Sequence, residues 1–251
     1  MKWIFLCSGM LMFLLNGPCH AESVVIGTDQ INPPMARKTD SSSHFIGFEV
    51  DIMNEICSRL HLTCAYQAVV ANQIIQKLQS TEIDLAINTI IIPNTKLEGL
   101  IFSLPYLPSN AQFMTLQSSS IKNFVDISNN TIGVSLGAFQ ENLAKDMYLK
   151  HIFNSKLKIK GYHNMAELLS ALETHKVDTI FSNKVTLDYW YYNNSSLYRM
   201  VGEPVQTGNG YGILATEKYQ PLIEDINKAI HQIMADGTYD RLYERYFSDF
   251  N

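Results

Sequence analysis

Clustered positive charge and catalytic signatures are both missing from this sequence. The 251 residues include 19 Lys and Arg against 24 Asp and Glu, a net charge of −5, and the basic residues form no run. Nucleic acids and anionic lipids need a positive surface to bind to, so both partner classes are excluded. There is no G-x-S-x-G elbow, Walker loop, G-x-G-x-x-G after a strand or H-E-x-x-H, and the histidines lack metal-ligand spacing. We therefore expect no catalytic residue, no metal and no cofactor.

Long hydrophobic runs are confined to the N-terminus. Residues 3–15 are almost wholly apolar, follow the single charge of Lys2, and end before the helix-breaking Asn16-Gly17-Pro18. This run of about a dozen residues is short for a membrane span, which needs about 20, so an uncleaved anchor is the weaker interpretation. The pattern predicts a signal peptide over residues 1–21, cleaved after Ala21, and export of the rest of the chain.

Cysteine is also scarce, with four in the whole sequence. Cys7 and Cys19 precede the predicted cleavage site, so the mature chain keeps only Cys57 and Cys64. No His or Asp cluster stands nearby to complete a metal site, and a single close pair in an exported protein is typical of a disulfide. We predict a disulfide between Cys57 and Cys64.

From Val24 onward, short β-rich apolar runs alternate with amphipathic helical stretches, which is the pattern of an α/β fold with largely parallel sheets. The pattern occurs twice, so it predicts two lobes with a ligand crevice at the carboxyl ends of their strands. The first series has strands at 24–26, 63–70 and 85–87 and helices at 48–60 and 72–78; the second has strands at 131–134, 158–160 and 179–181 and helices at 139–150, 165–172 and from 184; two last helices span 220–235 and 238–247.

Local motifs along the mature chain resemble the family 3 solute-binding proteins, the polar-amino-acid receptors of bacterial ABC importers. The Cys57/Cys64 spacing is similar to that of the histidine and lysine/arginine/ornithine receptors. The motifs occur in the family's order: Gly27-Thr28-Asp29 with Pro33-Pro34, Gly47-Phe48-Glu49-Val50-Asp51, Leu78-Gln79-Ser80 before Ile83-Asp84, Phe102-Ser103 before Pro105-Tyr106, Ile132-Gly133-Val134 and Ala235-Asp236-Gly237-Thr238-Tyr239.

The resemblance implies an α/β, two-lobed type II periplasmic binding protein with two hinge strands, near 111–116 and 207–214. Lobe 1 would comprise residues 22–110 and 210–251, and lobe 2 residues 111–209. It also implies a monomer in the periplasm that captures a small polar amino acid or a similar metabolite and passes it to an ABC permease of the inner membrane, without catalysis.

The resemblance further implies a ligand site whose residues depart from the family's pattern. Lys96 stands where the family has an arginine for the ligand carboxylate, and a lysine lacks the bidentate fork. Asn183 replaces the aspartate that pairs with the α-ammonium, Ile91 a Ser or Thr, and Asn32 a stacking side chain. The expected ligand-binding residues are Asp29, Asn32, Asn88, Thr89, Ile91 and Lys96 in lobe 1, and Phe139, Gln140 and Asn183 in lobe 2, where backbone N–H groups at a helix N-terminus could receive an anion.

Two alternatives stay open from the sequence. One is a degenerate receptor that senses or scavenges a ligand other than an amino acid, because several polar anchors are replaced. The other is a periplasmic enzyme similar to the cyclohexadienyl dehydratases, which resemble this family. Glu49 and Asp51 are interpreted as structural, and the aromatic run at residues 189–192 as core with an exposed edge.

Overall fold

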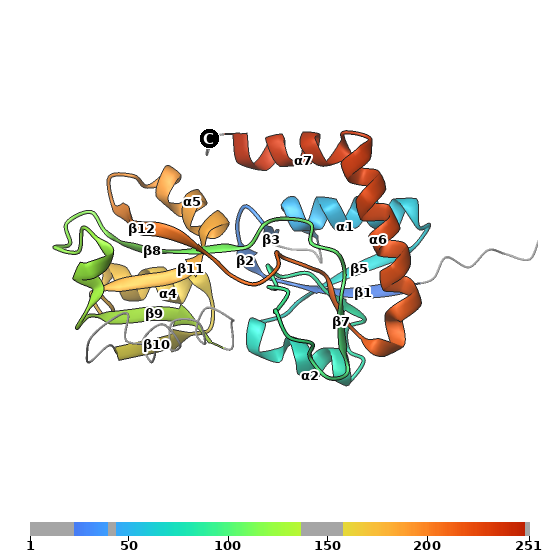
Figure 1. Cartoon of the computed structure of the whole chain (residues 1–251), viewed down its shortest axis with the longest axis horizontal. Helices are drawn as coiled ribbons and strands as arrows, with labels where there is room; N and C mark the ends of the chain where they lie inside the picture. The colour runs from blue at the N-terminus through green and yellow to red at the C-terminus, as the bar shows by residue number, and fades with distance from the viewer. Residues whose placement is uncertain (1–22, 40–43, 137–157, 249–251) are drawn as a thin grey trace, which may run out of the picture.

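The computed structural model describes residues 23–39, 44–136 and 158–248 (Figure 1). The predicted signal peptide, the predicted helix at 139–150, and therefore Phe139 and Gln140, lie outside these residues. Within them the chain forms two sheet-rich lobes, each built around one five-stranded mixed sheet.

The first sheet has the strand order β5-β1-β6-β13-β7. β1 pairs in parallel with β5 and β6, and β13 pairs antiparallel with β6 and β7. Helices pack on it because each has one apolar face; in α1 the buried positions include Phe48, Ile52 and Ile56, as the four-residue spacing predicts. The elements are β1 (Ser23–Thr28), α1 (Phe48–Arg59), β5 (Thr63–Ala68), α2 (Ile74–Gln79), β6 (Leu85–Ala86), β7 (Leu100–Phe102), β13 (Leu214–Thr216), α6 (Gln220–Ala235) and α7 (Thr238–Phe247), with 3-10 turns at Ala71–Gln73 and Glu217–Tyr219.

The second sheet has the order β10-β9-β11-β8-β12. β9 pairs in parallel with β10 and β11, whereas β8 pairs antiparallel with β11 and β12. The predicted inward positions of the helix at 165–172, Leu168, Leu169 and Leu172, are buried. Its elements are β8 (Asn110–Leu116), β9 (Thr131–Ser135), β10 (Lys158–Tyr162), α4 (Met165–Glu173), β11 (Thr179–Asn183), α5 (Lys184–Asn193) and β12 (Tyr198–Gln206), with a 3-10 turn at Phe124–Ile127.

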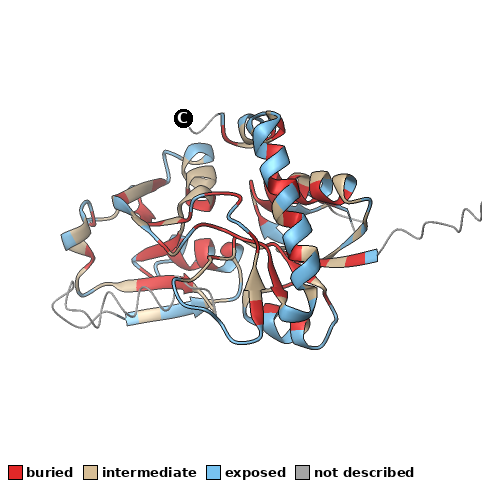
Figure 2. Cartoon of the chain, turned by 45° about the vertical axis from the view of Figure 1, so that its right-hand side comes forward, coloured by how far each residue is buried: buried red, intermediate tan, exposed pale blue. Residues whose placement is uncertain are grey.

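A small third sheet, β2 (Ile31–Asn32), β3 (Ala36–Lys38) and β4 (Phe45–Ile46), precedes α1. Buried residues gather on the sheets and on the helix faces turned toward them, while the outer face of α6 is exposed (Figure 2). The Cys57–Cys64 disulfide is present, with 6.3 Å between the Cα atoms, and joins α1 to β5. The predicted disulfide is therefore confirmed.

The chain passes from the first sheet to the second before β8 and returns after β12, and the two crossings lie side by side. The Thr207 N–H donates to the Ser109 carbonyl (3.0 Å), and the Gly210 N–H donates to Ser109 Oγ (3.0 Å). Gly208 has φ +61°, and a Cβ there would lie 2.3 Å from the Ile92 carbonyl oxygen, so the return crossing requires glycine. The second sheet begins at Asn110 and ends at Gln206, and the lobe boundaries stay a prediction.

Candidate functional site

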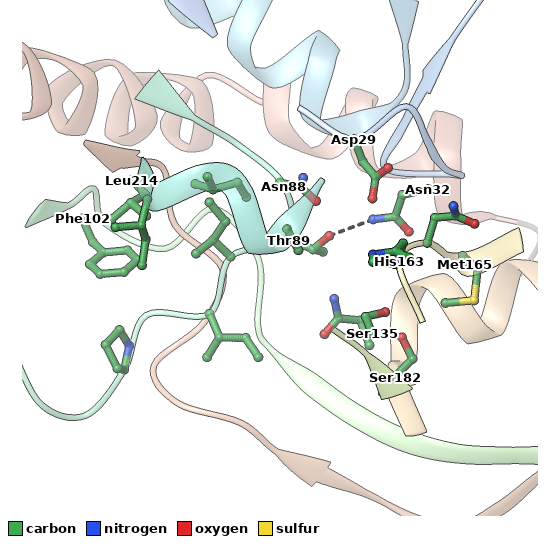
Figure 3. Close-up of a pocket in the computed structure, with 18 of the residues that line it drawn as sticks. Asp29, Asn32, Asn88, Thr89, Phe102, Ser135, His163, Met165, Ser182 and Leu214 are labelled. Atoms are coloured by element: carbon green, nitrogen blue, oxygen red, sulfur yellow. Dashed lines mark hydrogen bonds between the residues drawn. The ribbon is translucent and has the colours of Figure 1, made fainter. Parts of the chain in front are cut away.

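A cavity of about 430 Å³ lies between the two sheets, where several of their strands end. Because the carboxyl ends of parallel strands leave backbone and side chains free to meet a ligand, this is the expected place for a binding site in an α/β fold. Figure 3 shows the residues after β1 and β6 facing those at the ends of β9 and β11 and after β10. The polar lining comprises Asp29, Asn32, Asn88, Thr89, Thr95, Ser135, His163, Asn164, Ser182 and Asn183, and the apolar lining includes Ile74, Ile90, Ile91, Leu97, Phe102, Met165 and Leu214.

The charge of the cavity comes from one carboxyl group. Asp29 accepts a hydrogen bond from the Ile31 N–H (3.1 Å), and burial raises the pKa of its carboxyl above the usual value. His163 is the other titratable side chain in the lining, and no Lys or Arg occurs among the lining residues that the structure describes. The cavity therefore favours a cationic group near Asp29.

Asn32 connects the two lobes beside this cavity. Its Nδ2 donates to Thr89 Oγ1 (2.8 Å), drawn as a dashed line in Figure 3, and its Oδ1 accepts from Thr186 Oγ1 on α5 (2.8 Å). All three side chains are buried. The Asn32 amide is therefore engaged on both of its atoms by the protein itself, one partner lying in each lobe.

Glu49 lies behind the cavity wall and holds Thr89 from the other side. The Glu49 carboxylate Oε1 accepts from the Thr89 N–H and from the Tyr106 hydroxyl, each at 2.5 Å, and Glu49 is 0% exposed. Burial, with a smaller contribution from the charge of Asp29, raises the pKa of Glu49 to about 7. Thr89 has φ +47°, an unfavourable value for a residue with a Cβ, and these hydrogen bonds hold it there.

Six of the nine predicted binding residues line this one cavity: Asp29, Asn32, Asn88, Thr89, Ile91 and Asn183. Phe139 and Gln140 lie outside the described residues.

The structure does not bring Lys96 into the cavity. Its Nζ lies 3.2 Å from a carboxylate oxygen of Glu217, and its side chain is 77% exposed. Thr95 and Leu97, on either side of it, line the cavity, whereas Lys96 does not.

Sequence reasoning missed several cavity residues of the second lobe and the role of Glu49. Ser135, His163 and Ser182 each stand at or just after the end of a strand, and that position is the signal that could have identified them. The helical spacing predicts a surface position for Glu49, away from the apolar face of its helix; this prediction is wrong, because the structure buries Glu49 completely. Its contact with Thr89 joins positions 40 residues apart and has no local signal.

The described residues contain neither a metal-binding cluster nor a membrane-spanning helix. Among them, no group of three or more His, Cys, Asp or Glu side chains is arranged to hold a metal ion. The helices over the same ranges include none with the length and apolar character needed to cross a bilayer.

Comparison with known proteins gives consistent matches over almost the whole chain. Residues 24–249 match the family model of the bacterial extracellular solute-binding proteins, family 3. The arginine-binding periplasmic protein of Mannheimia haemolytica is 28% identical over 244 residues, 94% of this chain and 97% of the relative. The lysine/arginine/ornithine-binding periplasmic protein of Escherichia coli K12 is 26% identical, over 92% of this chain and 89% of the relative. The crystal structure of an arginine 3rd transport system periplasmic binding protein from Legionella pneumophila has a TM-score of 0.83 and 33% identity, over 90% of this chain and all of that one.

Proposed function

Since the chain belongs to the bacterial extracellular solute-binding proteins of family 3, we propose that it binds an amino acid with a cationic side chain for an ABC importer. The observation that carries this proposal is the cavity between the lobes, with a half-buried carboxylate at Asp29 and no Lys or Arg among its described lining residues. A cation that leaves water for such a cavity needs a carboxylate partner, and Asp29 supplies one. The two relatives compared above, named for arginine and for lysine, arginine and ornithine, support the same ligand class.

The rest of the ligand would meet neutral hydrogen-bonding groups. Ser135 and Ser182 of the second lobe and Asn88 of the first lobe line the same cavity and can donate to or accept from an amino acid. Leu97 and Phe102 offer apolar surface for an aliphatic side chain. A long side chain with one charged end and an apolar stem suits this combination.

The proposal also covers the export of the chain, its permease partner and its role in binding without catalysis. We infer that the chain is cleaved after Ala21, acts in the periplasm as a monomer, and passes its ligand to a permease. The similar relatives are named as periplasmic binding proteins, which supports both the compartment and binding without catalysis. Lobes of residues 22–110 with 210–251, and of 111–209, would close about the two crossings.

Titration calorimetry of the mature protein with L-arginine, L-lysine and L-glutamate tests the ligand class. We expect binding of arginine or lysine and none of glutamate. Asp29→Asn should weaken the binding of the cationic ligand by about 30-fold or more, since removal of one partner from a desolvated pair usually costs 2–5 kcal/mol. Asp225→Asn is the matched control, because Asp225 is an acid paired with Lys228 away from the cavity. Equal binding by parent and Asp29→Asn would contradict the proposal.

A second candidate is a receptor for a cation that is not an α-amino acid. The position of Lys96 outside the cavity favours it, since the residue predicted to hold the ligand carboxylate is paired with Glu217 instead. Agmatine, which is arginine without its carboxylate, separates the two candidates. Tighter binding of arginine than of agmatine supports the amino-acid receptor, and equal or weaker binding of arginine supports the second candidate.

A further inference from the structure

Glu49 is a buried acid with no counter-ion among the described residues, and it lies directly behind the cavity wall at Thr89. It lies in the first turn of α1 and is 0% exposed. Its Oε1 accepts two hydrogen bonds, from Thr89 and Tyr106, whereas its Oε2 is buried without a hydrogen-bond partner in the described part of the chain. A carboxylate placed in this way is costly unless something nearby compensates its charge.

The ionisable side chains that act on Glu49 do not supply that compensation. They are Asp29, which is an acid, and Tyr106 and Tyr211, whose own pKa values burial raises, so that both are neutral. The other acid of the same helical turn, Asp51, pairs with Arg245 (2.8 Å). This cation is therefore engaged by Asp51 and not by Glu49. The partial positive charge of the α1 N-terminus is the remaining favourable contribution.

The connection from Glu49 to the cavity runs through Thr89. The Thr89 N–H points at Glu49, and its hydroxyl, which accepts from Asn32, belongs to the cavity lining. Asp29 lines the same cavity. Two acids, one in the wall and one directly behind it, therefore act on the same space, and a cation bound there would relieve both.

We propose that Glu49 is a specificity-determining residue: its buried charge, acting through the wall at Thr89 without touching the ligand, favours a cationic ligand over a neutral one of the same shape. The inference rests on the proposed function, because it takes the ligand to be a cation in this cavity. Glu49 acts in two ways, since it fixes the Thr89 backbone and contributes negative potential. Only the second depends on its ionisation.

The selectivity is therefore linked to pH. The carboxylate form predominates above about pH 7 and the neutral acid below it, so preference for the cation increases as the pH rises from 6 to 8. His163 is the other titratable side chain in the cavity lining. The pH measurement therefore uses a His163→Gln background, in which Glu49 and Asp29 are the titratable groups at the cavity.

The test compares L-arginine with L-citrulline, its uncharged counterpart of nearly the same shape, by calorimetry at pH 8. Glu49→Gln keeps an oxygen that can accept from Thr89 and Tyr106 but removes the charge. We expect the arginine-to-citrulline affinity ratio to fall about tenfold in this variant, since one charge acting at short range in a site of intermediate dielectric is worth at least the corresponding 1.4 kcal/mol. Glu173→Gln is the matched control, because Glu173 accepts from Tyr198 in the second lobe as Glu49 accepts from Tyr106.

An unchanged ratio in Glu49→Gln would overturn the inference, because a purely structural role would weaken both ligands alike. If that variant does not fold, the His163→Gln protein provides the measurement: its ratio should rise about tenfold from pH 6 to pH 8, and a constant ratio would overturn the inference. Failure of the parent to bind arginine at all would instead overturn the proposed function, so the two failures are distinguishable.

Discussion

Raising the pH from 5 to 8 should destabilise the ligand-free protein, and Glu49 should account for the effect. Folding raises the pKa of Glu49 from 4.5 to about 7, so between these values the native state holds more protons than the unfolded state. Stability therefore falls as pH rises through this window and is lowest above the folded pKa. At 1.36 kcal/mol per pKa unit, Glu49 lowers the free energy of unfolding by about 2.5 kcal/mol between pH 5 and pH 8.

Urea unfolding at pH 5, 6.5 and 8, followed by circular dichroism, measures this slope. Glu49→Gln is the reference, because at pH 5 both proteins carry a neutral, buried group at the same place and should be similarly stable. The contribution of Asp236 stays constant over this range, since its hydrogen bonds to Thr238 and Arg59 hold its pKa at about 2. Parallel slopes in the parent and in Glu49→Gln would refute the reasoning, because every titratable group other than Glu49 is common to both.

Three further predictions concern the other contacts described above. Thr186→Val removes the hydrogen bond that joins the lobes through Asn32, so the ligand-free protein should show a larger radius of gyration in small-angle scattering; an unchanged radius would show that this contact does not hold the lobes together. Reduction of the Cys57–Cys64 disulfide, which spans a sequence separation of 7, should lower the free energy of unfolding by about 2–3 kcal/mol in urea titrations, and equal midpoints with and without reductant would contradict this. Lys96→Ala should change neither stability nor arginine affinity measurably, because exposed ion pairs contribute about 0–1 kcal/mol; a 30-fold loss of affinity would instead place Lys96 at the ligand, as its sequence position predicts.

The fold and most of the cavity could be predicted because they depend on local patterns. The four-residue spacing of Phe48, Ile52 and Ile56 predicts the buried face of α1 whatever packs against it. Asp29 follows β1 directly, and the carboxyl end of a parallel strand is where ligands bind in this class of fold. The family resemblance then selected Asn88, Thr89 and Asn183 from among the polar residues near other strand ends, and all three line the cavity.

Lys96 is the predicted binding residue that the structure places outside the cavity. Counting from a motif gives a position along the chain, but Lys96 lies in a loop between β6 and β7, where the position does not determine which way a side chain points. Here Thr95 and Leu97 line the cavity, and Lys96 pairs with Glu217 at the surface. The sequence holds no information on that pairing, because the two residues are far apart along the chain.

Glu49 is a different case, because the sequence predicts a structural residue on the helix surface and the structure shows a buried one beside the cavity. An acid in the first turn of a helix has a sufficient local explanation in the helix dipole, so nothing in the sequence asks for another. The structure supplies one. The Glu49 carboxylate is not exposed to water but buried behind Thr89, which lines the cavity. Because desolvation sets the pKa of such a group, its charge depends on what occupies the neighbouring cavity, and a bound cation would lower that pKa. Glu49 would then stabilise the fold in its neutral form and select a cationic ligand in its ionised form. The two effects have opposite pH dependence. Low pH favours folding, whereas high pH favours the preference for a cation.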